Sequence, residues 1–287
     1  MNPLSTIANR LIFTASAAAL CAFTVLPACV QAAALTYTVT DLGTLGGTFS
    51  YSGSINASGQ IAGYAYFPTD TVNHAVRWTG TTLTDLGTLG GMFSYGYGIN
   101  DLGQVAGLSY LTSGGFHAVR WTGTSPTDLG TLGGSASDSF AINASGQVTG
   151  FAGTPSNASH AVRWTGTTPE DLGTVGGSAS AGYGINALGQ VAGSSQITGD
   201  SAYHAVRWTG PTPTDLGTLG GTQGFGYGIN ASGQVAGYSQ LTGASAYHAV
   251  RWTGTTPTDL GTLGGTTAKG LWHQHLWGRH RYVLHDR

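Results

Sequence analysis

A repeat period of 43 to 44 residues constrains this chain more than any other feature of its sequence. The phrase DLGTLGG begins at Asp41 and recurs, with at most one substitution, at Asp85, Asp128, Asp171, Asp215 and Asp259. The phrase HAVRW keeps the same spacing and ends at Trp78, Trp121, Trp164, Trp208 and Trp252. A tandem array of this kind has to be interpreted as a series of equivalent structural units before any residue is given a chemical role.

Each unit contains four short segments with the alternation that is typical of β-strands. In the second unit these segments are TTLTDLG, SYGYGIN, QVAGLSY and FHAVRW. The phrase INDLGQ, which joins the second segment to the third, has Asn at its start and Gly where a left-handed backbone is needed, so it predicts a tight hairpin loop. Gly, Asn and Pro divide the segments so closely that no room is left for helices.

Four antiparallel strands in a unit of this length are typical of one propeller blade. The sequence therefore predicts an all-β fold, a β-propeller-like array of about five four-stranded blades. A β-solenoid is the alternative, but a solenoid stacks parallel strands, whereas the hairpin loops imply antiparallel neighbours. We expect the N-terminal segment LTYTVTDLG to pair with the last unit and close the ring.

The two ends of the chain differ from the repeats. Residues 1–32 contain a single basic residue, Arg10, before an apolar run and small residues, as in a secretory signal peptide. A membrane anchor and lipid attachment at Cys29 are the alternatives. Both cysteines lie in this segment, so the mature chain is expected to have none. The protein is thus expected to be secreted, periplasmic or held at the cell surface.

Residues 33–268 hold five repeats and the start of a sixth, and residues 269–287 match no repeat phrase. This tail is basic and His-rich. A one-base shift in one codon choice for residues 270–278 would encode GYGIN followed by TSG, close to the repeat phrase. We therefore expect a frameshift that truncated a longer array and left a disordered tail.

DLGTLGG, INASGQVAG and HAVRW occur in fixed order, and together they resemble the HAF repeat, named for His-Ala-Phe. The match covers nearly all of residues 36–266, although Val always stands at the Phe position. The resemblance implies an exported bacterial repeat protein and no settled activity.

The polar residues of the repeat are expected to form one structural contact per blade. A charge on an apolar strand is costly to bury unless it is paired. We therefore expect each Arg to stack on a Trp and to bind the Asp of DLG, in an arrangement similar to the Asp, His and Trp network of WD-repeat propellers. On this basis Asp128→Ala should cost about 3–5 kcal/mol. The glycines of DLGTLGG should allow close packing of blades or a backbone with positive φ.

The predicted network has one His, Arg, Trp and Asp in each unit: His74, Arg77, Trp78, Asp85, His117, Arg120, Trp121, Asp128, His160, Arg163, Trp164, Asp171, His204, Arg207, Trp208, Asp215, His248, Arg251, Trp252 and Asp259.

The same sequence argues against several other functions. Single His and Asp residues one repeat apart lack the local spacing of metal ligands, so no metal and no cofactor are predicted. Eleven acids and five arginines between Ala33 and Ala268 give a net negative repeat region that would repel nucleic acid. The non-repeating acids do not form an evident acid–base pair, and they are Asp70, Asp101, Asp138, Glu170 and Asp200.

We expect an exported, non-catalytic repeat protein with a structural or ligand-binding role. The variable loops, such as YAYFPTDTVN and SSQITGDSAY, are rich in Tyr, Ser and Thr, which suit a glycan or another cell-surface component. The alternative is a propeller hydrolase or lyase that acts on polysaccharide.

Overall fold

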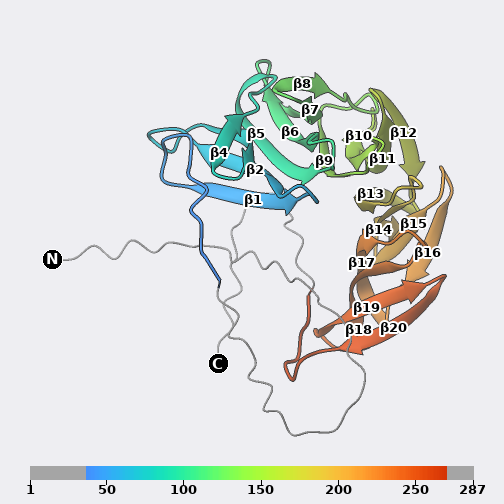
Figure 1. Cartoon of the computed structure of the whole chain (residues 1–287). Coiled ribbons are helices and arrows are strands. Elements are labelled where there is room, and N and C mark those ends of the chain that lie inside the picture. Colours follow the sequence, from blue (N-terminus) through green and yellow to red (C-terminus); the bar gives the residue numbers. More distant parts are fainter. Residues whose placement is uncertain (1–36, 270–287) are drawn as a thin grey trace, which may run out of the picture. The chain divides into compact units, whose positions relative to one another are not determined.

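The computed structural model describes residues 37–269, which form strands, turns and loops (Figure 1). Contacts divide the chain after Asp41, and all twenty strands lie in the second unit, from Leu42 onward. Within residues 37–269 there is no helix of the length and apolar character needed to cross a membrane. The predicted signal peptide at 1–32 lies outside the described residues, as does the predicted tail beyond Lys269.

The strands fall into five blades of four consecutive strands each. The first blade has β1 (Ser50–Ile55), β2 (Gln60–Tyr66), β3 (Asn73–Thr79) and β4 (Thr82–Asp85). The second has β5 (Gly90–Ile99), β6 (Val105–Leu111), β7 (Phe116–Thr122) and β8 (Ser125–Asp128). The third has β9 (Ser137–Ile142), β10 (Val148–Gly153), β11 (Ser159–Thr165) and β12 (Thr168–Gly173). The fourth has β13 (Gly176–Ile185), β14 (Val191–Ile197), β15 (Tyr203–Trp208) and β16 (Pro213–Gly217). The fifth has β17 (Gly220–Ile229), β18 (Val235–Leu241), β19 (Tyr247–Thr253) and β20 (Thr256–Gly261).

Pairing within each blade is antiparallel, as the hairpin phrases predicted. In the first blade β1 pairs with β2, β2 with β3, and β3 with β4. Three of the four pairs of neighbouring blades meet through a short parallel contact, for example between Asn73 of β3 and Phe93 of β5, and the second and third blades do not. The first strands of neighbouring blades also contact one another. This arrangement confirms the propeller-like fold and contradicts the solenoid alternative.

The predicted closure of the ring by the N-terminal segment is wrong for the residues that the structure describes. Residues 37–41 form no strand, β1 pairs only with β2, and β20 pairs only with β19. The physical reason lies in the repeat itself. The residues that lead into the second DLG copy form β4, which pairs with β3 of its own blade and does not join two blades.

Four of the five hydrophobic clusters lie in the junctions, by which we mean the contacts between one blade and the next. The fifth lies in the first blade, where Leu42 and Leu45 pack against Val76 and Trp78. In the first junction Ala62 and Ala75 of one blade pack against Val105, Val119 and Trp121 of the next. The other three junctions bury equivalent side chains. Small residues on one face of each blade thus leave the space that a tryptophan of the following blade fills.

Two repeated glycines set the backbone of each blade. Gly103, in the hairpin loop, has a φ of 72°, which confirms the predicted left-handed position. Gly193, in the second strand of the fourth blade, faces a bulge in the first strand. A Cβ at this position would lie 1.9 Å from the carbonyl oxygen of Ala181 and 2.9 Å from the Trp208 ring.

We expect Gly193→Ala to lower the free energy of unfolding by about 2–3 kcal/mol, because the added methyl group meets a backbone carbonyl that cannot rotate away. Gly210→Ala is the matched control, since its Cβ would meet no atom within 4 Å and its φ is not positive. Denaturant unfolding followed by circular dichroism measures both. Equal losses in the two variants would contradict the close approach at the bulge.

Candidate functional site

The Asp of DLG pairs with the His of HAVRW in every blade. In the first blade His74 Nδ1 lies 2.9 Å from Asp85 Oδ1 and 3.0 Å from Oδ2. Asp85 Oδ1 also accepts a hydrogen bond from the Gly87 amide at 2.8 Å. Burial acts to raise the pKa of Asp85, but the bonds from His74 and Gly87 outweigh it and hold that pKa below its ordinary value. The other four blades have the same pair, in His117–Asp128, His160–Asp171, His204–Asp215 and His248–Asp259.

The predicted bond between each Arg and the DLG aspartate is therefore wrong. Asp85 lies opposite Val76 in the β3–β4 pair, and the pleat places it on the same face as His74 and away from Arg77. Arg77 and Trp78 are successive residues on a strand, so they point to opposite faces, and the predicted stacking of one on the other is also wrong.

The arginines reach the next blade instead. Arg77 Nη1 donates to the Gly103 carbonyl at 2.7 Å, and Arg120 Nη1 donates to the Gly146 carbonyl at 2.9 Å. The third and fourth arginines make the equivalent bond, from Arg163 to Gly189 and from Arg207 to Gly233. The tryptophans of the predicted network are buried in the core in all five blades.

We expect Asp128→Ala to cost about 1 kcal/mol, not the 3–5 kcal/mol that a buried Arg pair would give. The Asp128 side chain is 41% exposed beside His117, so water replaces much of the lost contact. Asp128→Asn keeps an oxygen for the Gly130 amide, which Asp128 Oδ1 caps at 2.8 Å, and should cost less. Urea unfolding measures both variants, and a loss of 3 kcal/mol or more in Asp128→Ala would restore the buried-pair interpretation.

Four of the five non-repeating acids hold loops or strands together. Asp70 accepts from the amide and hydroxyl of Thr48 at 2.8 and 2.6 Å, and Asp200 does the same for Ser178. The Asp101 carboxylate accepts from the Ala57 amide of the preceding blade at 2.9 Å. Glu170 binds Nε and Nη2 of Arg163, the arginine opposite it on the neighbouring strand. These contacts give each of the four a structural role.

Asp138 is the exception. It lies on β9, is 4% exposed, and accepts one hydrogen bond, from the Ser139 amide at 2.7 Å. Burial raises its pKa well above the ordinary value, and the Ser139 amide opposes this only in part. The carboxyl group therefore favours its neutral form. Its charge would also act on the nearby Tyr97 hydroxyl, whose pKa is raised by burial first and by Asp138 second.

Aromatic rings form a continuous row that passes through all five blades. Successive ring centroids along it lie 4.8–6.4 Å apart, within the range of favourable aromatic pairs. Six of these side chains are half-buried and Tyr51 is exposed, whereas Tyr64 and Tyr227 are buried. The aromatic row consists of Tyr51, Tyr64, Tyr95, Tyr97, Phe140, Tyr183, Tyr227, Tyr238 and Tyr247.

Sequence reasoning named Tyr64, as the start of the variable segment YAYFPTDTVN, but took it for a loop residue and missed the row; the structure places Tyr64 in β2. The signal was present in the first strands, where aromatic residues alternate with small ones, as in SYGYGIN and FGYGIN. Such alternation places every aromatic ring of a strand on one face. Only the contacts between blades join these faces into one row.

No protein-family model matches this chain, and no curated protein matches its sequence. Among solved structures, TolB from Acinetobacter baumannii, a β-propeller, superposes with a TM-score of 0.50 and 12% identity. The match covers 76% of this chain and 57% of the TolB chain, so the chain spans little more than half of that protein. The fucose-binding lectin of Aleuria aurantia, a six-bladed β-propeller, gives a TM-score of 0.39 with 15% identity over 75% of this chain and 79% of the lectin. At these identities the TolB match supports the propeller-like fold alone.

Proposed function

We propose that this chain is an exported, non-catalytic binding protein of the HAF-repeat type, and that the aromatic row is its ligand surface. The observation that supports this function best is the continuity of the row across five blades. An isolated ring is common on protein surfaces, but here nine rings are in contact, and the seven that are half-buried or exposed can present one extended aromatic surface to a partner. Structural roles already account for the repeated polar residues, which leaves the row as the main unassigned feature.

The chemistry of the row favours a neutral, polar ligand with flat apolar faces, and a glycan fits that description. Aromatic faces bind the C–H faces of sugar rings, while tyrosine hydroxyls can hydrogen-bond to sugar hydroxyls. Three such hydroxyls already take part in hydrogen bonds of 3.2 Å, between Tyr183 and Ser194 and between Tyr227 and Tyr238. Asp138, which lies close enough to the row to act on Tyr97, has its pKa raised by burial.

The structure gives no specific support to the alternative, an enzyme that acts on polysaccharide. Glycoside hydrolysis by the common mechanism requires two carboxyl groups that flank the scissile bond. Burial, and not a neighbouring carboxylate, raises the pKa of Asp138. The other four non-repeating acids of residues 37–269 hold backbone amides, hydroxyls or Arg163.

Binding to immobilised neutral polysaccharides tests the proposal with two matched variants. Tyr183→Ala removes a ring from the middle of the row, where it contacts Phe140 and Tyr227. Phe67→Ala removes a half-buried ring that follows β2 and contacts His74. We expect Tyr183→Ala to weaken binding about two- to tenfold, the loss of one stacked ring, and Phe67→Ala to leave it unchanged. Loss of binding in Phe67→Ala alone would move the site to the loops, and no binding by the wild type would overturn the glycan proposal.

A further inference from the structure

The four junctions between blades share one set of hydrogen bonds. An Asn side chain of each blade donates to the carbonyl of the equivalent Asn in the next, at 2.9–3.1 Å. The Arg of the same blade donates to the Gly carbonyl in the next hairpin loop. Every junction thus has a donor face, on the preceding blade, and an acceptor face, on the following blade.

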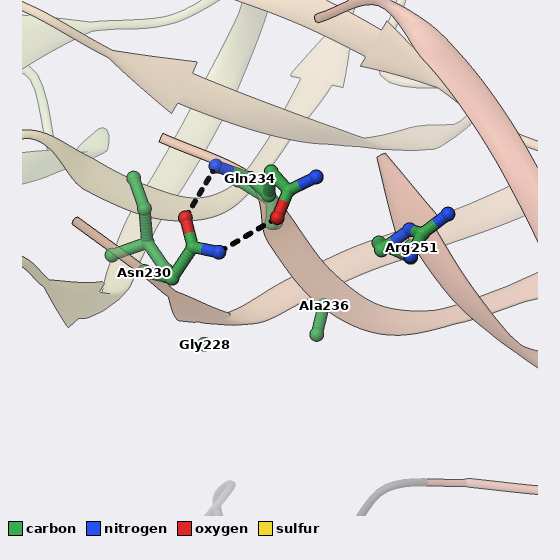
Figure 2. Close-up of a pocket in the computed structure, with 7 residues that line it drawn as sticks. Gly228, Asn230, Gln234, Ala236 and Arg251 are labelled. Atoms are coloured by element: carbon green, nitrogen blue, oxygen red, sulfur yellow. Dashed lines mark hydrogen bonds between the residues drawn. The ribbon is translucent and has the colours of Figure 1, made fainter. Parts of the chain in front are cut away.

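The fifth blade presents a donor face that no blade covers. Ala236 is exposed, whereas its equivalents Ala62, Ala106 and Ala192 are fully buried. Asn230 Nδ2 donates only to Gln234 Oε1 of its own hairpin, at 2.8 Å. Figure 2 shows this Asn–Gln pair, with Arg251 set apart from it.

The same face contains a hollow of about 270 Å³, which Gly228, Val235 and Ala236 help to line. Arg251 also lines it, is exposed, and has no acceptor within residues 37–269. In the internal junctions the next blade occupies the equivalent space. The hollow therefore has the shape and the donors of an unfilled junction.

The first blade presents the complementary acceptor face. Ile55 is 48% exposed, whereas its equivalents, such as Ile99 and Ile142, pack against the core of a junction. Gly59 is exposed, whereas its equivalent Gly103 is buried beneath the arginine of the preceding blade. The carbonyl groups of Asn56 and Gly59 are the counterparts of those that accept from Asn and Arg elsewhere.

We infer that the donor face of the fifth blade binds the acceptor face of the first blade in a second copy of this chain. Both faces have open edges in the same molecule, because β1 pairs only with β2 and β20 only with β19 among the described strands. On the first blade Leu42 and Leu45 already pack against the buried Val76 and Trp78, so the open part of its face is the edge with Ile55 and Gly59. Each junction already present shows that the two faces fit one another in shape and in hydrogen bonding. Association of this kind is head-to-tail, so it leaves one free face at each end of a pair and allows further copies to add.

Two end variants of the full chain test this inference. Arg251→Glu removes the arginine donor of the fifth blade and would place a carboxylate opposite the carbonyl groups of Asn56 and Gly59 in the second copy. Ile55→Glu places a charge on the acceptor face. Sedimentation or light scattering from about 1 to 100 µM, the range of weak protein association, measures the mass. We expect wild-type mass to rise with concentration and each variant alone to stay monomeric.

An equimolar mixture of the two variants should form a dimer and nothing larger, because each variant retains one intact face that complements the intact face of the other. Leu188→Glu, in an exposed hairpin loop of the fourth blade, should behave as the wild type. Ala236→Asp tests the donor face a second time, and circular dichroism checks that every variant is folded. Any of three results would overturn the inference. The wild type could stay monomeric at all concentrations, the end variants could associate as the wild type does, or the mixture of the two could fail to dimerise. The wild type would stay monomeric if the donor face of the fifth blade were covered by the first blade of the same molecule or by residues 270–287.

Discussion

Trp164→Ala is expected to lower the free energy of unfolding by about 3–5 kcal/mol, the range for truncating a large buried aromatic side chain. Trp164 is fully buried in the junction between the second and third blades. It packs there against Ala106, Ala118 and Val148. The alanines are too small to move into the space that the indole would leave, so most of the cavity would remain. Denaturant unfolding followed by far-ultraviolet circular dichroism measures the loss.

Trp164→Phe is the matched control, because it keeps a ring in the junction. The indole Nε1 of Trp164 has no hydrogen-bond partner within residues 37–269, so the phenyl ring also removes a buried, unpaired donor. We expect a loss of about 1 kcal/mol, the cost of a small reduction in core volume. Equal losses in the two variants would show that the junction does not depend on side-chain volume.

The sequence was sufficient to predict the propeller-like fold because each local signal repeats five times. The phrase INDLGQ predicts its hairpin from the preferences of Asn and Gly alone. The structure places Gly103 at positive φ in that hairpin, as expected. A turn depends on a few neighbouring residues, so chemistry close in sequence is enough to define it.

The error in the repeated network came from ignoring the alternation of side chains along a strand. His74 and Arg77 are three positions apart, so they point to opposite faces, and one carboxylate cannot serve both. Cross-strand register decides between them, since Asp85 lies opposite Val76. The alternation of HAVRW was visible in the sequence, but the register of the strand carrying Asp85 was not.

The roles of the Arg side chains and of the aromatic row depend on contacts between blades. Arg77 and Gly103 belong to successive repeats, and no local pattern links residues at that separation. The identity of Asp138 is visible as an exception at a position where the first and second blades have Tyr51 and Tyr95. Its burial became apparent only when neighbouring blades were placed around it.

Asp138→Asn is expected to stabilise the protein at neutral pH and to change the pH dependence of its stability. The pKa of Asp138 is raised in the folded state, so the folded protein holds a proton that the unfolded chain releases above about pH 4. The stability that this bound proton gives to the folded protein is fully present below the pKa of Asp138 in the unfolded chain. It is lost as the pH rises through the pKa of Asp138 in the folded protein. For one proton the loss is at most about 1.4 kcal/mol per pH unit. Asn keeps the shape and the acceptor for the Ser139 amide without carrying this charge.

Urea unfolding at several pH values between about 4.5 and 7.5, which lie above the usual carboxyl pKa, measures the difference between wild type and variant. That difference should grow with pH, because the unfolded wild-type chain ionises Asp138 ever more favourably while the folded protein keeps its proton, and the Asn variant has no such group. Asp70→Asn is the matched control: hydrogen bonds from Thr48 lower the pKa of Asp70, so its carboxylate is ionised in both states over this range and the difference between wild type and Asp70→Asn should stay constant. The stabilising effect of Asp70 is present above the unfolded pKa and disappears on acidification. A constant difference across the pH range for Asp138→Asn would mean that Asp138 is solvated in the folded protein, and the row beside it would then have to accommodate a charge.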